Sequence, residues 1–265
     1  MSSLVVFAGN PAQPDSATPL GRVLLQSLEE GGFSGPVTRL DIEGEITAKL
    51  SELAQTLTDK HRVEVRPFAG DLGVSAEQTA LVDMAGDIDI LVNNAGGIPS
   101  GGITKIDEAT WRKGWDLKVF GYINITRAVY PKMVARGKGV IVNVIGEAGE
   151  SPFADYIAGC SGNAALIAMN KALGLASFKR GVRVVAVNPG PTNSERHQAH
   201  VKIRAERELG DPARWAELHA RFPAGRAADV IEVARAVAFL ASDAASYISG
   251  ASIRVDGGIS MSRPV

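Results

Sequence analysis

Residues 140–166 read VIVNVIGEAGESPFADYIAGCSGNAAL, and this stretch decides the fold. Its first five residues are apolar apart from one asparagine, a run that is typical of a buried strand. A Gly-rich loop with three acidic residues follows, and Tyr156 then opens a predicted helix that is rich in small residues. A strand that delivers such a loop and helix start at its carboxyl end is typical of ligand sites on α/β sheets.

Outside this stretch, strand-like apolar runs alternate with helix-like periodic segments, which predicts βαβ units and a parallel sheet. The predicted strands span residues 4–8, 37–40, 63–68, 88–92, 140–144, 182–187 and 252–255. The predicted helices span residues 20–30, 46–60, 75–84, 108–134, 156–175, 195–210, 212–221 and 230–242. No repeat or break in composition divides the sequence, so we expect a single domain over residues 1–265.

The composition narrows the class of protein. A chain of 265 residues with 45% hydrophobic residues can bury one sizeable core. Its net charge of -1 gives no electrostatic reason to expect nucleic acid or a membrane surface as a partner. Cys160 is the only cysteine, which excludes an internal disulfide and suits a reducing cytoplasm. No stretch approaches the roughly 18 apolar residues that span a bilayer. We therefore expect a soluble cytoplasmic protein.

Three further motifs follow predicted strands: ILVNNAG at 90–96, NPGP at 188–191 and VDGG at 255–258. Asparagine side chains satisfy polar groups between strands, and glycine lets the backbone approach a ligand. From about Asp71 onward, these motifs and residues 140–166 resemble the short-chain dehydrogenase/reductase family. The resemblance implies a doubly wound, Rossmann-like parallel sheet of about seven strands flanked by helices. It also implies NAD or NADP as cofactor, a small-molecule substrate, and a homotetramer or dimer assembled through the helices 108–134 and 156–175.

The same resemblance implies which residues face the cofactor. They are Asn94, Ala95 and Gly96 after the fourth strand, Pro189, Gly190, Thr192 and Ser194 after the sixth, and Asp71 with Leu72 against the adenine. At the end of the second strand, the Asp41 carboxylate would accept hydrogen bonds from a ribose diol, which favours NAD. Arg39 would pair with a 2′-phosphate, which favours NADP, and the sequence leaves both open.

The first loop departs from the family pattern, which is Thr-Gly-x-x-x-Gly-x-Gly. Here residues 8–21 read AGNPAQPDSATPLG, with Gly9 and Gly21 on the first and last glycines. The three prolines of this loop lack the amide protons that hold a pyrophosphate, and Asp15 adds a negative charge. Two interpretations stay open: a rearranged loop that uses the hydroxyls of Ser16 and Thr18, or a lost phosphate site.

The family's catalytic arrangement is an asparagine, a serine, a tyrosine and a lysine four residues after the tyrosine. Tyr156 lies at the tyrosine position and is predicted to be the general acid/base, whose pKa a nearby ammonium lowers. The other three positions hold Lys118, Gly146 and Cys160. We predict that Lys118 supplies the missing cation. The alternative is that Lys118 extends to solvent and Tyr156 is a buried ring.

Further residues complete the predicted site. Ser151 is a candidate for a displaced catalytic hydroxyl, and Asn163 adds a polar contact. Gly146, Glu147, Cys160 and Arg196 are predicted to lie next to the substrate, under a lid formed by residues 195–221. Arg196, His197 and Lys202 are candidates for binding an acidic group. Otherwise the histidines at 61, 197, 200 and 219 are expected at the surface, and we predict no metal site.

Three functions fit the sequence. The first is an atypical NAD(P)-dependent oxidoreductase that interconverts a carbonyl and a secondary alcohol. The second is a non-catalytic subunit of a mixed oligomer with a paralogue, which accounts for the altered first loop and the absent serine and lysine. The third is a cofactor-independent lyase or hydratase that uses Tyr156 and a carboxylate of the loop 146–155.

Overall fold

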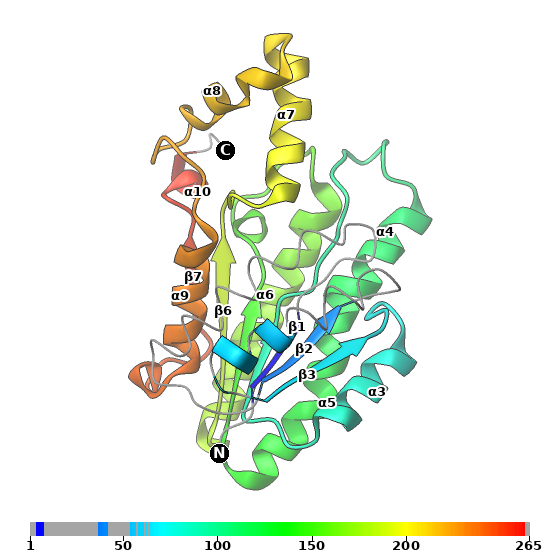
Figure 1. Cartoon of the computed structure of the whole chain (residues 1–265), viewed down its shortest axis with the longest axis vertical. Helices are drawn as coiled ribbons and strands as arrows, with labels where there is room; N and C mark the ends of the chain where they lie inside the picture. The colour runs from blue at the N-terminus through cyan, green and yellow to red at the C-terminus, as the bar shows by residue number, and fades with distance from the viewer. Residues whose placement is uncertain are drawn as a thin grey trace.

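The computed structural model describes residues 4–7, 37–41, 54–56, 58–60, 62 and 64–262, and only the backbone of residues 4–7, 37–41, 195 and 196. Its strands form one parallel 7-stranded sheet in the order β3-β2-β1-β4-β5-β6-β7 (Figure 1). The strands are β1 (Leu4–Phe7), β2 (Val37–Asp41), β3 (Val65–Ala69), β4 (Ile90–Asn93), β5 (Gly139–Val144), β6 (Val182–Pro189) and β7 (Ser252–Val255). This order, with β1 next to β4, confirms the predicted doubly wound sheet.

Helices cover both faces of the sheet (Figure 1). They are α3 (Ser75–Ala85), α4 (Glu108–Trp115), α5 (Gly121–Arg136), α6 (Ile157–Ser177), α7 (Glu195–Leu209), α8 (Trp215–His219), α9 (Val230–Ala241) and α10 (Ile259–Ser262). Successive strand residues point to opposite faces, so Val142 packs against α9 while Ile141 packs against α3 and α5. Among the residues that the structure describes, no helix is long and apolar enough to span a membrane.

The predicted helix 108–134 is interrupted in the structure. Between α4 and α5 lies a π-helix, η2 (Asp116–Phe120), in which the Gly121 amide donates to the Asp116 carbonyl five residues back. Hydrophobic spacing does not distinguish this wider turn from an α-helix, which is why the sequence predicted one continuous helix. The interruption contains Lys118.

The segment 195–221 is called the lid here after its predicted role, which stays a prediction. Its first expected helix, 195–210, is confirmed as α7. The helix expected over 212–221 is shorter: a 3-10 turn, η5 (Pro212–Arg214), leads into α8. Both helices stand beyond the carboxyl ends of the strands (Figure 1). The helix predicted over 20–30 lies outside the described residues, as does most of the one predicted over 46–60, of which 54–56 and 58–60 are helical.

A chain of hydrogen bonds between three buried asparagines connects β4, β5 and α6 in the middle of the fold. The Nδ2 atom of Asn93 on β4 donates to Oδ1 of Asn143 on β5 at 2.9 Å. The Nδ2 atom of Asn143 donates to Oδ1 of Asn170 on α6 at 3.1 Å, and Asn170 donates to the Ala251 carbonyl before β7. All three asparagines are fully buried. Because each buried amide depends on its neighbour for a partner, the chain fixes α6 relative to the sheet.

We expect Asn143→Leu to lower the free energy of unfolding by about 2–4 kcal/mol. It leaves the buried Oδ1 atom of Asn170 without its donor and takes one of two acceptors from Nδ2 of Asn93, which keeps Thr126. Urea unfolding followed by circular dichroism measures this loss. The control is Asn193→Leu, which removes an exposed hydrogen bond with Gln198 and should cost less than about 1 kcal/mol. An equal loss of unfolding free energy in the two variants would contradict the structural role of the hydrogen-bonded asparagines.

Candidate functional site

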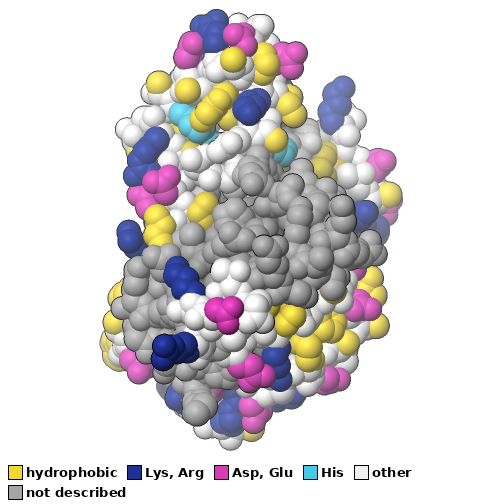
Figure 2. All heavy atoms as spheres, in the orientation of Figure 1, with side chains coloured by type: hydrophobic (Ala, Val, Ile, Leu, Met, Phe, Trp, Pro, Cys, Tyr) yellow, Lys and Arg dark blue, Asp and Glu magenta, His cyan; other side chains and the backbone are white. Residues whose placement is uncertain are grey.

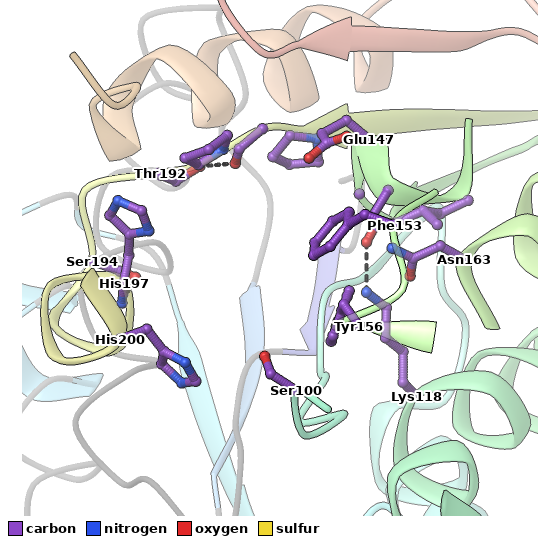
Figure 3. A pocket seen from close by; sticks show the side chains of 16 residues that line it. Ser100, Lys118, Glu147, Phe153, Tyr156, Asn163, Thr192, Ser194, His197 and His200 are labelled. Carbon is purple, nitrogen blue, oxygen red and sulfur yellow. Dashed lines mark hydrogen bonds between the residues drawn. The ribbon is translucent and has the colours of Figure 1, made fainter. Parts of the chain in front are cut away.

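A cavity of about 370 Å³ lies at the carboxyl end of the sheet, between the loops after β4, β5 and β6 and the lid helix α7 (Figure 3). Its volume falls within the range of small-molecule sites. It is lined by Ser100, Lys118, Ile145, Gly146, Glu147, Ala148, Phe153, Tyr156, Asn163, Pro189, Gly190, Pro191, Thr192, Ser194, His197 and His200. Most of the predicted site residues that the structure describes after β5 and β6 therefore line one cavity.

Tyr156 immediately precedes α6 and is half-buried at the cavity wall. Its ring lies over Gly159, where an added Cβ would overlap the ring atoms. On another side it stacks on Phe153, with ring centroids 5.9 Å apart. The absence of a side chain at 159 is therefore what allows Tyr156 this position, since any larger residue would displace the ring.

Cys160 does not line the cavity. It is buried, and its Sγ atom lies 3.4 Å from the Phe153 amide and 3.5 Å from the Phe153 carbonyl. The loop after β5 thus passes directly over this position. A longer side chain in the same direction would meet the Phe153 backbone, so the path of the loop suits a small residue at 160.

Lys118 lies on the π-helix and reaches the cavity from the side opposite the lid (Figure 3). Its aliphatic part passes Gly96, where an added Cβ would lie 3.0 Å from Lys118 Cδ. Its ammonium donates to the Ile145 carbonyl at 2.5 Å. The side chain therefore points inward to the end of β5 and does not extend to solvent.

Two residues on either side of the π-helix, Trp115 at the end of α4 and Tyr122 in α5, make similar bonds. Trp115 Nε1 donates to the Ala158 carbonyl at 2.9 Å, and the Tyr122 hydroxyl donates to the Val144 carbonyl at 2.8 Å. Burial raises the pKa of Tyr122 well above its usual value, so this hydroxyl keeps its proton. Together these donors connect the end of β5 and the start of α6 to the segment formed by α4, the π-helix and α5.

Gly146 begins the loop after β5 with φ 134°, a backbone conformation that favours glycine. An added Cβ there would lie 2.8 Å from Nδ2 of Asn163, which faces it from α6. Asn163 is 2% exposed, and its Oδ1 atom has no hydrogen-bond partner among the described residues. Glu147, 5% exposed, also lines the cavity, so the site contains a buried carboxyl group.

The segment after β6 forms the facing wall. Gly190 packs so closely on Asp256 that an added Cβ would lie 2.8 Å from its Cα atom, and Thr192 donates to the Gly190 carbonyl at 3.0 Å. Ser194 caps α7 by accepting a hydrogen bond from the His197 amide at 3.2 Å. This wall is therefore closely packed on the side where the family resemblance places the cofactor.

Other predicted site residues lie elsewhere. Ser151 does not line the cavity, and its amide donates to the Glu147 carbonyl at 3.0 Å. Asn94, Ala95 and Gly96 follow β4, and the Lys118 side chain passes next to Gly96. Asp71 and Leu72 follow β3, where the Asp71 carboxylate accepts a hydrogen bond from the Gly73 amide. Asp41 ends β2, but its side chain, that of Arg196, and the glycines 9 and 21 lie outside what the structure describes. Their roles stay predictions.

Comparison with known proteins identifies the family. The sequence profile of the family described as enoyl-(acyl carrier protein) reductase matches residues 26–260. The 3-oxoacyl-(acyl-carrier-protein) reductase of Rickettsia felis is 31% identical over 252 residues, which are 91% of this chain and 98% of that protein. The chain belongs to the short-chain dehydrogenase/reductase family.

Solved structures agree with this assignment. An oxidoreductase of the short-chain dehydrogenase/reductase family from Burkholderia thailandensis has a TM-score of 0.78 at 26% identity, with 97% of this chain and 92% of the other covered. An L-sorbose reductase from Gluconobacter frateurii, solved with NADPH and L-sorbose, has a TM-score of 0.83 at 26% identity, with 97% of each chain covered.

In this short-chain dehydrogenase/reductase, the lid contains a histidine pair that the sequence did not predict. The Nε2 atoms of His197 and His219 lie 2.9 Å apart, and His219 packs between Trp215 and Phe222. The prediction of surface histidines was wrong for His197, which is half-buried, and for His219, which is buried, while the exposed His200 lines the cavity. His197 and His219 are 22 residues apart, so no local sequence pattern indicates their contact.

The charged residues of the lid are mostly paired with one another. Arg204 and Arg221 both contact Glu208, and Arg214 contacts Glu217. Figure 2 shows both signs of charge interspersed around the outer end of the lid. Lys202, a candidate for binding an acidic group, is exposed and does not line the cavity. Among the described residues, no group of three or more His, Cys, Asp or Glu side chains could hold a metal ion.

The histidine pair predicts a dependence of stability on pH. Burial, followed by the charges of His219 and His200, lowers the pKa of His197 from 6.5 to about 4, and burial lowers the pKa of His219. The unfolded chain therefore takes up protons first as the pH falls below 6.5, so stability should decrease between pH 6.5 and about 4.

We expect His197→Gln to reduce this decrease, measured as the shift of the urea midpoint between about pH 7 and about pH 5. Lys202→Gln, at an exposed position on the same helix, is the control and should keep the dependence of the wild type. The same pH shift in all three proteins would show that the pair does not titrate as its burial predicts.

Proposed function

We propose that this protein is an atypical NAD(P)-dependent oxidoreductase that interconverts a carbonyl and a secondary alcohol, with Tyr156 as the general acid/base. One observation carries the proposal: Tyr156 and Lys118 line the same cavity at the carboxyl end of the sheet. In a doubly wound fold this is where ligands bind. The fixed ring of Tyr156, held between Gly159 and Phe153, supports a positioned proton donor.

In the direction of reduction, the Tyr156 hydroxyl gives its proton to the oxygen of the substrate carbonyl, and in oxidation the phenolate takes that proton back. The phenolate needs a nearby positive charge to exist near neutral pH. Lys118 supplies it in this proposal, in place of the lysine that the family has at the position of Cys160. Its bond to the Ile145 carbonyl holds the ammonium at the cavity wall.

The described part of the site fits a nicotinamide ring. Pro189, Gly190 and Thr192 line the cavity opposite Tyr156, and the close packing of Gly190 on Asp256 gives this wall a fixed shape. A bound nicotinamide dinucleotide would supply or accept the hydride. The L-sorbose reductase with a TM-score of 0.83 was solved with NADPH, which supports a cofactor of this class here. The choice between NAD and NADP rests on Asp41 and Arg39.

We expect calorimetric titration to show binding of NADH or NADPH with a Kd below about 100 μM, which corresponds to about −5.5 kcal/mol. If Asp41 binds the ribose diol, Asp41→Ala will weaken binding of NADH more than binding of NADPH. Failure of both dinucleotides to bind would contradict the proposal. In that case the non-catalytic subunit of a mixed oligomer becomes the better account.

We expect Tyr156→Phe to lower kcat by about 100-fold or more, because it removes the proton donor. Lys118→Met keeps the length of the side chain but removes the charge, so the pH at which oxidation reaches half its maximal rate should rise. Lys113→Met, at an exposed position five residues earlier, is the control. An unchanged pH profile in Lys118→Met would contradict the role of Lys118.

The buried Glu147 favours a second candidate, a cofactor-independent lyase or hydratase in which this carboxyl group and Tyr156 exchange protons with the substrate. The two candidates differ in one measurable respect. An activity that Tyr156→Phe abolishes, and that neither NADH, NADPH nor their oxidised forms affect, would favour the second.

A further inference from the structure

Ser100 is a hydroxyl-bearing residue of the cavity that has no part in the proposed proton transfer. It lies in the loop between β4 and α4, is exposed, and lines the same cavity as Tyr156 and Lys118. In Figure 3 its hydroxyl points into the cavity, in the space between His200 of α7 and Tyr156. No hydrogen bond joins this hydroxyl to another residue that the structure describes, so it can donate to a ligand.

Backbone hydrogen bonds fix the loop of Ser100 beside Tyr156. The Gly101 amide donates to the Asp155 carbonyl at 2.7 Å, and the Ile157 amide donates to the Gly101 carbonyl at 3.4 Å. Gly101 therefore pairs with Tyr156 as residues of two parallel strands do. Because Ser100 immediately precedes Gly101, the same bonds fix its backbone relative to the proposed proton donor.

The other hydroxyl groups of the region are placed differently. Thr192 donates to the Gly190 carbonyl, and Ser194 caps α7, both on the wall after β6 where the resemblance places the cofactor. Ser151, the predicted displaced hydroxyl, does not line the cavity. Of the serines and threonines that the structure describes, Ser100 is thus the one that lines the cavity outside the wall after β6.

We propose that Ser100 is a catalytic residue that donates a hydrogen bond to the carbonyl oxygen of the substrate, in place of the serine that the family has at the position of Gly146. The proposal rests on the proposed function for the reaction. In the reduction, the carbonyl carbon receives the hydride of NAD(P)H, and the π electrons of the C=O bond move to the oxygen. The oxygen takes the proton of Tyr156, which leaves a secondary alcohol and NAD(P)⁺.

The Ser100 hydroxyl keeps its own proton throughout this reaction. Negative charge grows on the carbonyl oxygen as the hydride arrives, so a hydrogen bond to that oxygen is stronger in the transition state than in the bound ketone. A donor that acts in this way raises kcat more than it lowers KM. The position of Ser100 next to the residue that pairs with Tyr156 suits two donors to one oxygen.

Reduction of cyclohexanone with NADH or NADPH tests the proposal. We expect Ser100→Ala to lower kcat by about 100-fold with a smaller change in KM, because it removes one donor to the developing oxyanion. Ser100→Thr keeps a hydroxyl and should restore kcat to within about tenfold of the wild type. Ser161→Ala, at an exposed serine of α6 that bonds within its own helix, should leave kcat unchanged.

Two kinetic outcomes would overturn the proposal while leaving the proposed function intact. One is a kcat of Ser100→Ala equal to that of the wild type. The other is a larger loss of kcat in Ser151→Ala than in Ser100→Ala, which would return the missing hydroxyl to the loop after β5. Because Ser100 is exposed, its replacement should not unfold the protein, and circular dichroism checks this.

A second measurement separates the proposal from the proposed function. If the wild type reduces cyclohexanone with neither cofactor, the proposed function fails for this ketone. Cyclohexanone labelled with ¹³C at the carbonyl then reports the hydrogen bond directly by NMR, because a donor to the oxygen moves the carbonyl resonance downfield. We expect the bound resonance to lie further downfield in the wild type than in Ser100→Ala. Equal shifts in the two proteins, or no binding to the wild type, would overturn the proposal.

Discussion

The chain of buried amides from Asn93 through Asn143 to Asn170 is the constraint on which the site depends. A parallel sheet fixes its strands by backbone bonds, but those bonds do not determine where a helix lies on the sheet. Here the side chain of Asn170 determines it, because its amide is bonded to β5 on one side and to the segment before β7 on the other. Asn163 lies on the helix that is fixed in this way, and Tyr156 immediately precedes it.

A second set of bonds fixes the loop between β5 and α6. Trp115, Lys118 and Tyr122 donate to three carbonyls at the end of β5 and the start of α6. The π-turn lies within this set, and an extra residue in a turn changes which side chains face the sheet. The position of the Lys118 ammonium therefore depends on a local irregularity of the backbone, held by neighbours that take no part in the proposed chemistry.

The parts of the molecule that were predictable are those with a local signal. Short apolar runs located all the strands of the sheet to within about two residues, and strand ends located the cavity. The contacts that shape the site depend instead on the directions of side chains: His197 toward His219, Cys160 toward the Phe153 backbone, and Tyr156 over Gly159. A sequence shows each of these residues but not the direction of its side chain, so Cys160 was placed next to the substrate although it faces the loop.

The small residues at 146, 159 and 160 each pack closely against a neighbour in the loop after β5 or the start of α6. Gly146 has no side chain where Asn163 needs room, Cys160 is short where the loop crosses α6 at Phe153, and Gly159 is bare where the Tyr156 ring rests. Enlarging one of them would require its neighbour to move, since each contact is already close. Residues 146, 159 and 160 are thus parts of one packing of the loop on α6. That packing fixes the Tyr156 ring at the cavity wall, which is the position that the proposed proton transfer requires.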